Sequence, residues 1–544
     1  MKMKTSTGRK IRYGSTSIVI VALVLAIVIA LNAIVTLLTR KFMWYGDMTP
    51  EAKFTLSEEC LYLLGETDPN NGKVSAIEKL KKRTDGVKIN ILFPLEKDVA
   101  QSTDPYVYNT AEELRAKFSD YVTTEYVDAL SRPKRFEKYL SSTTETIDLN
   151  SIIIECGTQF RIKTFKSFYT YNNGEPYAYN AEKSFSSAIL AVTSAQTPLA
   201  CYTTNHEETF LTTTGFQNKT VVNPLLIAVE NAGFNVQPID LSKEEIPDEC
   251  RLLITFNPKH DFQSEGGTRL DKSDELKKLD AFLEDRNSFM VFLDPGVGEL
   301  PILEGFLEEW GLVVRRDKIT GEAVTLRDPA NSVLNNQNAL IGEYTQNDLM
   351  EGWAEDLSAK VVFEDAMIID YAKDYKKTTQ SFTKDNKKIE FTLAHNDSSG
   401  RKVFSMFNTS DTADGYVDGE NIWNATKKER AMLMAVSTKQ YTEQEGWNSI
   451  TDSAYVMLCG SVDFAAPKYL QSKAYGNDDL LLTAFSLSGR EPVPVGLLPN
   501  PIANFNIESI STRAATICTV VLTLMPLVIA SGVGTIVLVR RKNR

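Results

Sequence analysis

The feature that most constrains this chain is a long uncharged apolar run near its start, Ile18–Leu38. As a helix rising ~1.5 Å per residue, its 21 residues would cross a bilayer core of ~30 Å. Basic residues and no acidic residue precede the run, so the positive-inside bias predicts a transmembrane helix over residues 18–38 and a cytoplasmic tail over residues 1–17. A cleaved signal peptide is the alternative. It is disfavoured because the run exceeds the usual ~7–15 residues and no small-x-small site precedes Arg40.

A second uncharged run, Ala514–Val539, ends at a basic cluster. The same bias predicts a transmembrane helix over residues 514–539 and a cytoplasmic tail over residues 540–544. Both termini would then be cytoplasmic. Residues 43–513 would form an extracytoplasmic region tethered to the cell membrane at both ends.

Four residues in the two runs suggest contact between helices. Asn32 could donate an interhelical hydrogen bond, and Pro526 removes a backbone donor and should kink its helix. Ala530 and Gly534 form a small-xxx-small pair that allows close helix packing. We expect these residues to pack the two helices on each other and on a permease within the lipid bilayer. A lipid-facing helix with incidental small residues is the alternative.

Charge and cysteine content limit the function classes. All 71 acidic residues fall in residues 42–512, where the formal net charge is −24. A region this acidic is repelled by phosphate backbones, so nucleic-acid binding is not expected. The basic residues at the two ends are explained by the predicted membrane topology and by attraction to anionic lipid headgroups. Five cysteines without CxxC spacing lie in the outer region, where we expect mostly buried free thiols. One disulfide among these cysteines is the alternative.

The fold class predicted for the outer region is α/β. Residues 43–195 alternate helical and strand patterns, typical of a layered α/β module. Residues 196–330 predict a Rossmann-like module, because near-continuous apolar strands separated by helices indicate a parallel sheet covered on both faces. Its strands are predicted at Leu199–Thr203, Phe234–Asp240, Cys250–Phe256 and Phe289–Leu293, and its helices at Val221–Asn231 and Asp274–Glu284.

Residues 331–500 are predicted as the remainder of the α/β region, with a weaker signal. Glu429–Val436 is predicted as a helix, Tyr455–Cys459 as an apolar strand and Asp478–Leu487 as a helix.

Several short motifs follow one another in an order that resembles a known family. They are Lys10–Gly14, Asp47–Thr49, Phe54–Ser57, Thr204–Glu208, Ile254–Pro258, Asp274–Leu276 leading to Phe289–Pro295, Val456–Phe464 and Gly476–Leu481. In this order, with two apolar end runs, they resemble the GldG-like extracytoplasmic auxiliary subunits of ABC transporters, of the gliding-motility type. The resemblance spans nearly the whole chain and departs from the family at loop positions, where Asn205, Glu207 and Ser461 replace its usual residues.

The resemblance implies a sheet similar to that of class I glutamine amidotransferases and ABC permease and ATPase partners. The chain itself has no GxGxxG after a predicted strand and no P-loop, so no cofactor is expected and ATP hydrolysis must belong to another polypeptide. Glutaminase-like catalysis is also not expected, because neither Cys201 nor Cys459 sits on a strand-to-helix elbow.

One cluster of polar residues is a candidate ligand site. His206, Glu208, His260, Asp261 and Asp294 follow successive predicted strands, and carboxyl ends of parallel strands are where α/β proteins bind ligands. No metal-ligand spacing joins these residues, so no metal is expected; solvated loop polars and helix caps are the competing interpretation.

The sequence therefore predicts a non-catalytic, membrane-anchored auxiliary subunit of an ABC transport system. Its outer domain would capture a substrate, gate its passage or couple transport to the envelope. The alternative is a membrane-tethered envelope hydrolase or glycan-binding protein that uses a crevice formed by His206, His260 and Asp294.

Overall fold

The structure is a computed structural model of the 544-residue chain. The chain divides into two compact units, Met1–Asn500 and Pro501–Arg544. The structure describes residues 55–66, 74–140, 146–172, 175–194, 197–208, 211–215, 219–263, 274–333, 335–350, 359–384, 387–426, 429–445, 448–472, 474–489 and 493–502, together with residues 23, 26, 27, 29–31 and 539.

The prediction of one transmembrane helix at each end is corrected by the structure. Among the described residues, no helix is both long and apolar enough to cross a membrane. The longest helices of the described part with known ends have 13 residues. A helix of this length spans only ~20 Å of the ~30 Å that a bilayer core requires. Most of residues 18–38 and 514–539 lie outside the described part of the chain, as do Asn32, Pro526, Ala530 and Gly534.

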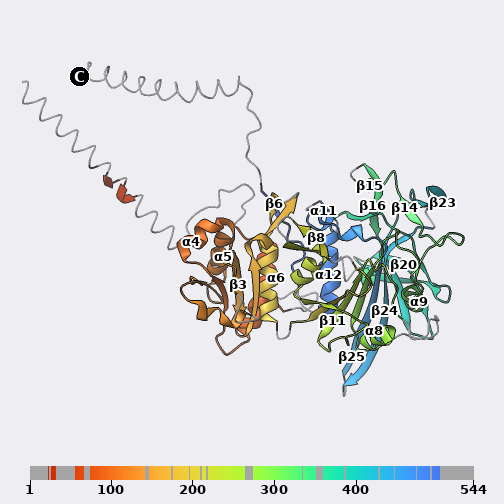
Figure 1. The fold of residues 1–544 in the computed structure, drawn as a ribbon, viewed down its shortest axis with the longest axis horizontal. Coiled ribbons are helices and arrows are strands. Elements are labelled where there is room, and N and C mark those ends of the chain that lie inside the picture. The colour runs from red at the N-terminus through yellow and green to blue at the C-terminus, as the bar shows by residue number, and fades with distance from the viewer. Residues whose placement is uncertain are drawn as a thin grey trace, which may run out of the picture. The chain divides into compact units, whose positions relative to one another are not determined.

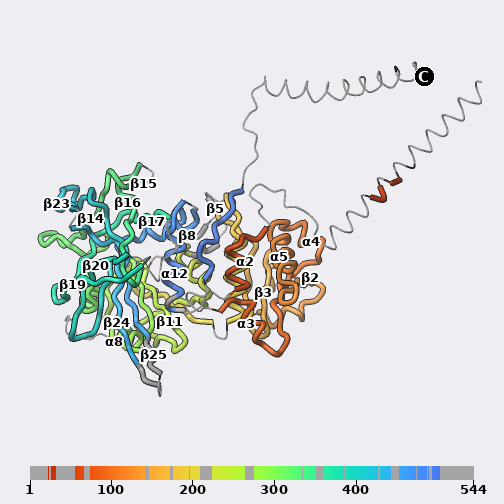
Figure 2. The backbone as a smooth tube through the Cα atoms, turned by 180° about the vertical axis from the view of Figure 1, so that it is seen from behind, coloured from red at the N-terminus to blue at the C-terminus, as the bar shows by residue number. Residues whose placement is uncertain are grey.

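The first part of the chain folds into a four-stranded sheet in the order β2-β1-β3-β4. β1 pairs in parallel with β2 and antiparallel with β3, and β3 and β4 form a hairpin. β3 is buried at every residue, because helices cover the sheet, as Figures 1 and 2 show. The strands are β1 (Ile89–Phe93), β2 (Val122–Tyr126), β3 (Ser151–Cys156) and β4 (Gln159–Thr164).

Some of the helices of this part begin at side-chain caps. The Ser57 hydroxyl accepts a hydrogen bond from Cys60 N at 3.2 Å and caps α2, and Asp104 caps α5 through the N–H groups of Tyr106 and Val107. The elements are α2 (Glu58–Gly65), α3 (Ala76–Lys81), α4 (Lys97–Thr103), α5 (Pro105–Lys117), η2 (Pro133–Arg135), η3 (Glu137–Tyr139), η4 (Phe165–Phe168), β5 (Tyr169–Asn172), β6 (Glu175–Tyr179) and α6 (Ala181–Thr193).

A sheet of 14 described strands forms the larger part of the fold. Its first five strands, in the order β10-β7-β11-β12-β25, are all parallel. They are β7 (Leu199–Thr203), β10 (Asn235–Ile239), β11 (Cys250–Phe256), β12 (Ser288–Phe292) and β25 (Asn448–Cys459). The parallel sheet that the sequence predicts is thus only one part of a mixed sheet, because β25 pairs antiparallel with β24 and the order continues through β21, β16 and β15.

The antiparallel part explains a wrong prediction. Residues 429–436 were predicted as a helix, but β24 (Met432–Glu445) is a strand with β21 on one side and β25 on the other. The remaining strands of the 14-stranded sheet are β13 (Leu312–Val314), β15 (Ser332–Val333), β16 (Asn336–Tyr344), β17 (Val361–Glu364), β18 (Ile369–Tyr371), β19 (Lys376–Lys384), β20 (Lys387–Asn396) and β21 (Arg401–Asn408). A separate three-stranded sheet consists of β14 (Thr325–Arg327), β22 (Asp414–Val417) and β23 (Glu420–Asn424).

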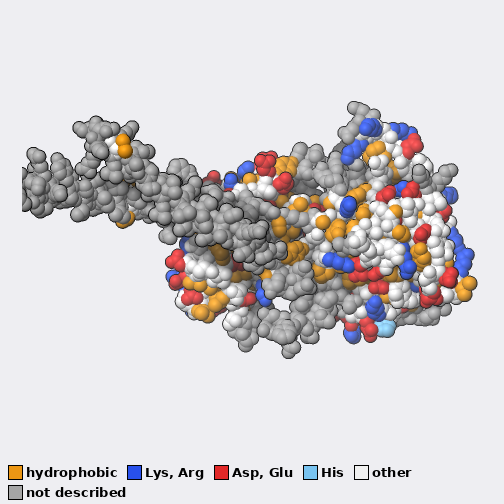
Figure 3. Space-filling model, turned by 90° about the horizontal axis from the view of Figure 1, so that it is seen from above, with side chains coloured by type: hydrophobic (Ala, Val, Ile, Leu, Met, Phe, Trp, Pro, Cys, Tyr) orange, Lys and Arg blue, Asp and Glu red, His pale blue; other side chains and the backbone are white. Residues whose placement is uncertain are grey.

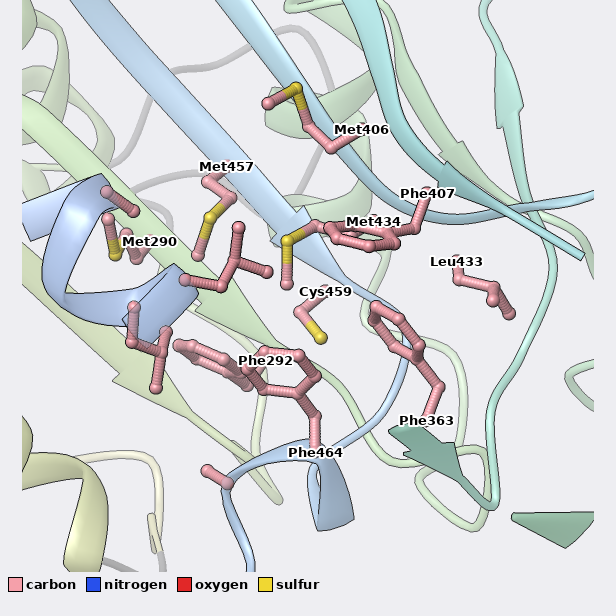
Figure 4. Packing of buried hydrophobic residues seen from close by; sticks show 14 of the residues in the cluster. Met290, Phe292, Phe363, Met406, Phe407, Leu433, Met434, Met457, Cys459 and Phe464 are labelled. Atoms are coloured by element: carbon pink, nitrogen blue, oxygen red, sulfur yellow. The ribbon is translucent and has the colours of Figure 1, made fainter. Parts of the chain in front are cut away.

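Helices cover both faces of the parallel strands. Leu252 and Met290 pack with α7 and α12 on one face, whereas Leu253 and Phe289 pack with α8 and α9 on the other. Figure 4 shows the first face, where methionines and aromatic rings from several strands point toward one another. The other helices and short elements are β8 (Leu211–Gly215), β9 (Lys219–Val222), α7 (Pro224–Asn231), α8 (Asp274–Glu284), α9 (Pro301–Glu309), η5 (Asp463–Ala465), α11 (Pro467–Leu470), α12 (Asn477–Gly489) and β26 (Asn500–Pro501).

The five cysteines in the described residues are buried and free. They are Cys60, Cys156, Cys201, Cys250 and Cys459, and they pack as small apolar side chains.

Candidate functional site

The predicted site residues follow three parallel strands. His206 and Glu208 follow β7, His260 and Asp261 follow β11, and Asp294 follows β12. Their shared location at the carboxyl ends of parallel strands is the arrangement that the sequence suggested. The structure nevertheless gives the five side chains four different environments.

His206 is buried between two carboxylates. It is 1% exposed and stacks on Phe262, with 4.1 Å between the ring centroids. Its Nδ1 lies 2.8 Å from Glu208 Oε1, and its Nε2 lies 3.4 Å from Glu275 Oε2. Burial alone would lower the pKa of His206, but the two carboxylates outweigh burial and raise this pKa to about 9. The Asn205 side-chain nitrogen also lies 3.1 Å from Nε2. A pKa raised in this way favours the protonated ring at neutral pH, a form that does not accept a proton.

His206 and its partners join several loops. The backbone N–H groups of Lys259 and His260 donate to the His206 carbonyl at 2.8 and 3.2 Å. The Gln263 N–H donates to Glu275 at 2.6 Å. This geometry assigns His206 a structural role, holding the loop after β7 against the loop after β11 and the start of α8.

Glu275 is a member of this cluster that the sequence analysis missed. It is 2% exposed and lies in the first turn of α8. The sequence does place an acidic residue at the start of a predicted helix, where carboxylates are favoured. Its pairing with His206 was not, because 69 residues separate the two in the chain.

His260 and Asp261 point to different places. The His260 side chain is 65% exposed, and its Nε2 lies 3.2 Å from Glu207 Oε1, which is also exposed. Asp261 instead caps α9 from a distance: Ile302 N donates to its Oδ2 at 2.7 Å and Leu303 N donates to its Oδ1 at 3.0 Å. Asp261 thus satisfies two backbone donors that the helix itself leaves unpaired.

Asp294 is the one predicted site residue that lines a large groove. This groove has a volume of about 1160 Å³ and lies at the carboxyl ends of β11, β12 and β25, which contribute Asn257, Asp294 and Asp463. The starts of α7 and α12 form a second side, with Asn223, Pro224, Asp478 and Asp479. The third side comes from the N-terminal part of the chain and includes β4, β5 and Lys183 of α6.

A buried ion cluster ties α6 to α12 at this groove. Lys183 Nζ lies 2.6 Å from Asp478 Oδ2 and 3.2 Å from Asp479 Oδ1, and the lysine side chain is 4% exposed. Burial disfavours the ammonium, but the two carboxylates outweigh burial and raise the pKa of Lys183. The cluster carries one more negative than positive charge.

Two other charged groups of the groove carry no ion pair within the described residues. Asp463 is half-buried, and its pKa is raised by burial and by the neighbouring carboxylates of Glu364, Asp365 and Asp294. Its nearest cation, Lys468, pairs with Glu364. Lys163 lies on β4, where burial lowers its pKa despite the attraction of Glu230. The groove therefore has an acidic region at Asp294 and Asp463, and separate basic residues at Lys163 and Lys166, with Glu230 near Lys163.

The groove lining is chemically mixed. None of the three histidines and none of the described cysteines lies in the groove. Among the described residues, no group of three or more His, Cys, Asp or Glu side chains is placed to hold a metal ion. What remains is a mixed surface of amide, hydroxyl, carboxylate, tyrosine and aliphatic groups, which suits the recognition of a polar ligand.

Comparisons with known proteins identify no family. No family model matches the sequence, and no curated protein matches it. Among solved structures, "mmIFT52 N-terminal domain" is similar over 53% of this chain and 96% of its own length, with 15% identity and a TM-score of 0.33. "Cytoplasmic Protein STM3548 from Salmonella typhimurium" is similar over 53% of this chain and 98% of its own length, with 9% identity and a TM-score of 0.28. These scores are too low to support a functional argument.

Proposed function

We propose that this protein is a non-catalytic auxiliary subunit of an ABC transport system, working with a separate permease and a separate ATPase. Residues 43–513 would act on the outer side of the cytoplasmic membrane, where they capture a ligand or gate its passage. The observation that carries this proposal is the groove of about 1160 Å³ at the carboxyl ends of β11, β12 and β25. This is the edge at which open α/β sheets bind ligands.

Two further observations support a binding role. The sequence has no P-loop, so an ATP-driven cycle would need a partner ATPase. His206, the best-placed candidate base in the sequence, is held between Glu208 and Glu275 with a pKa of about 9. A base must be largely deprotonated at working pH to accept a proton, so His206 does not suit hydrolysis at neutral pH.

Glycan binding is the second candidate, and one observation favours it. Tyr169, Tyr171 and Tyr475 all line the groove, and tyrosine offers both an apolar ring face and a hydroxyl to a polar ligand. The ligand tests of the next subsection separate this possibility from the capture of a polypeptide.

Co-purification tests the proposed partners. The tagged full-length protein, extracted from its native cells in a mild detergent, is expected to bring down a multi-span permease and an ABC ATPase. A matched sample carrying Asp294→Asn and Asp463→Asn should retain both partners, because these residues belong to the groove. Recovery of the tagged protein without any ABC component contradicts the proposal.

Surface labelling tests the proposed location. Ile319 is 93% exposed, so Ile319→Cys provides a reactive thiol, whereas the five described native cysteines are buried. Both proteins carry Cys518→Ser, because Cys518 lies outside the described residues. A membrane-impermeant maleimide is expected to label the Ile319→Cys variant in intact cells, and the matched protein that keeps Ile319 should stay unlabelled. Labelling only after cell lysis would contradict an outer location.

A further inference from the structure

One side of the groove is formed by the unpaired edge of a β-strand. Within the described residues, β4 pairs only with β3, as the last strand of the order β2-β1-β3-β4. The two strands are joined by the two-residue turn Gly157-Thr158, with Gly157 at φ +65°, which fits a tight hairpin closed by a hydrogen-bonded pair at Cys156 and Gln159. Natural sheets usually cover or charge such an edge, because its free N–H and C=O groups invite another strand.

The register identifies which backbone groups of β4 are free. Hydrogen-bonded and non-hydrogen-bonded pairs alternate along an antiparallel hairpin. Counting from the turn, Ile162 opposite Ile153 and Thr164 opposite Ser151 fall in non-hydrogen-bonded pairs, so their N–H and C=O groups point away from β3. The Thr164 carbonyl accepts a hydrogen bond from Ser167 Oγ at 2.7 Å, so the free groups are the N–H and C=O of Ile162 and the N–H of Thr164. The next hydrogen-bonded position agrees with this count, since Phe165 N donates to the Asn150 carbonyl at 2.7 Å.

This free edge faces the groove. Ile162, Lys163 and Thr164 all line it, although successive side chains of a strand point to opposite faces of the sheet. Three consecutive lining residues mean that the strand meets the groove edge-on. The same holds for β5. Among the described strands it pairs only with β6, and its residues Tyr169, Thr170 and Tyr171 also line the groove.

The rest of the groove suits an extended chain with a basic side chain. Ile162, Ile227 and Leu498 line it and are 40%, 39% and 47% exposed, offering apolar contacts along its length. Asp294 and Asp463 supply negative charge without an ion pair among the described residues. On one face of the molecule, Figure 3 shows hydrophobic side chains gathered toward the middle, with acidic and basic side chains interspersed around them. The volume of about 1160 Å³ is also larger than the ~300–1,000 Å³ of most small-molecule pockets.

We propose that the groove binds an extended polypeptide segment of a partner protein, which adds as a fifth strand to the free edge of β4 and places a lysine or arginine against Asp294 and Asp463. An extended chain presents backbone donors and acceptors every second residue, ~6.6–6.8 Å apart, which matches the spacing of Ile162 and Thr164 along β4. The inference rests on the proposed function, since it names the ligand class of the groove that the auxiliary subunit would use for capture.

Binding of a defined peptide to the full-length protein tests this inference. The probe is a fluorescent peptide of about eight alternating lysine and valine residues, compared with its glutamate–valine counterpart and with a neutral hexasaccharide. The lysine peptide is expected to bind about tenfold or more tightly than the glutamate peptide, because it can pair with Asp294 and Asp463. Tighter binding of the glutamate peptide, through Lys163 and Lys166 of the same groove, would contradict the proposed placement of a basic side chain. Asp294→Asn with Asp463→Asn should remove this preference.

Two substitutions at Ile162, one to proline and one to valine, test the backbone contact. Ile162→Pro removes an N–H that points into the groove and makes no bond to β3, so the hairpin should survive while peptide affinity falls about tenfold. Ile162→Val keeps the N–H and is expected to bind as the parent does. Hydrogen–deuterium exchange should show slower exchange over residues 159–165 when the lysine peptide is bound to the parent protein. Thermal unfolding of each variant checks that it is folded. If Ile162→Pro does not fold, the exchange measurement on the parent protein decides.

The possible outcomes separate the two proposals. Absence of lysine-peptide binding at about 1 mM, or binding that leaves the exchange of residues 159–165 unchanged, overturns strand addition. Binding of the hexasaccharide in place of the peptide overturns it as well, but leaves ligand capture standing. The auxiliary-subunit proposal fails separately, if no ABC component co-purifies.

Discussion

At the scale of single residues, His206 shows how burial changes the role of a side chain that the sequence marks as a candidate ligand. Histidine in a loop after a parallel strand suggests ligand binding. Here Glu208 pairs with Nδ1, Asn205 and Glu275 both contact Nε2, and Phe262 covers the ring face. Such a side chain stabilises the fold and is inaccessible to a substrate.

The raised pKa of His206 predicts that stability falls at alkaline pH. Because the folded-state pKa of about 9 lies above the unfolded value of ~6.5, the stabilisation is fully present below pH ~6.5 and is lost as the pH rises through about 9. A shift of this size corresponds to at most ~3 kcal/mol of unfolding free energy. The measurement is urea unfolding at pH 6, 7.5 and 9.5.

His206→Gln is the control for this prediction. Glutamine cannot titrate, so the variant should be less stable at pH 6 and should lose much of the decline between pH 6 and pH 9.5. Parallel pH profiles for the parent and the variant would show that the pKa of His206 is the same in the folded and unfolded protein, which would contradict the prediction.

At the scale of elements, Asp261 illustrates a helix cap supplied by another part of the chain. The residue before α9, Leu300, offers no side-chain cap, and the Asp261 carboxylate accepts from Ile302 N and Leu303 N instead. The sequence placed Asp261 in a candidate ligand site, because a cap 41 residues away from its helix has no local signature.

We expect Asp261→Ala to lower the unfolding free energy by ~1 kcal/mol, the usual cost of losing a helix cap. Asp261→Asn keeps a side-chain oxygen acceptor and should cost less. Chemical denaturation of the two variants beside the parent measures the difference. Equal stability of Asp261→Ala and the parent would show that the cap contributes nothing.

The strands show where local patterns suffice and where they fail. The predicted strand Cys250–Phe256 and helix Asp274–Glu284 are confirmed with their bounds, because a buried apolar run and a helical repeat are visible within a short window. Residues 429–436 were predicted wrongly, because alanine, leucine and methionine favour a helix. β24 is a strand because it is buried between β21 and β25, and tertiary pairing overrides such a preference.

At the scale of the whole molecule, the Lys183 cluster joins the N-terminal part of the chain to the larger sheet. Lys183 and Asp478 are 295 residues apart in sequence and pair with almost no solvent access. A lysine on α6 that faces two carboxylates at the start of α12 fixes one side of the groove. Its effect on stability depends on both partners being present.

Removing one side of this cluster should be costly, and removing both sides should restore stability. Lys183→Met leaves buried carboxylates unpaired and is expected to cost ~3–5 kcal/mol. The triple variant with Asp478→Asn and Asp479→Asn should recover much of this loss, since no uncompensated buried charge remains. Urea unfolding of the parent, single and triple variants measures the coupling. A triple variant less stable than Lys183→Met would contradict an electrostatic origin.

By itself, the sequence determined the local features of this protein: the apolar parallel strands and their α/β class, and an acidic central region between basic ends. Only the tertiary structure decided that the parallel strands belong to a mixed sheet, that the five candidate site residues occupy four different environments and that Asp294 lines a groove with the free edge of β4. It also overturned the two flanking transmembrane helices, since no described helix has the required length and apolarity. The physical reason is range. Capping and periodicity act over a few residues, whereas a groove, a buried ion cluster and a strand edge arise from residues that meet only after the chain has folded.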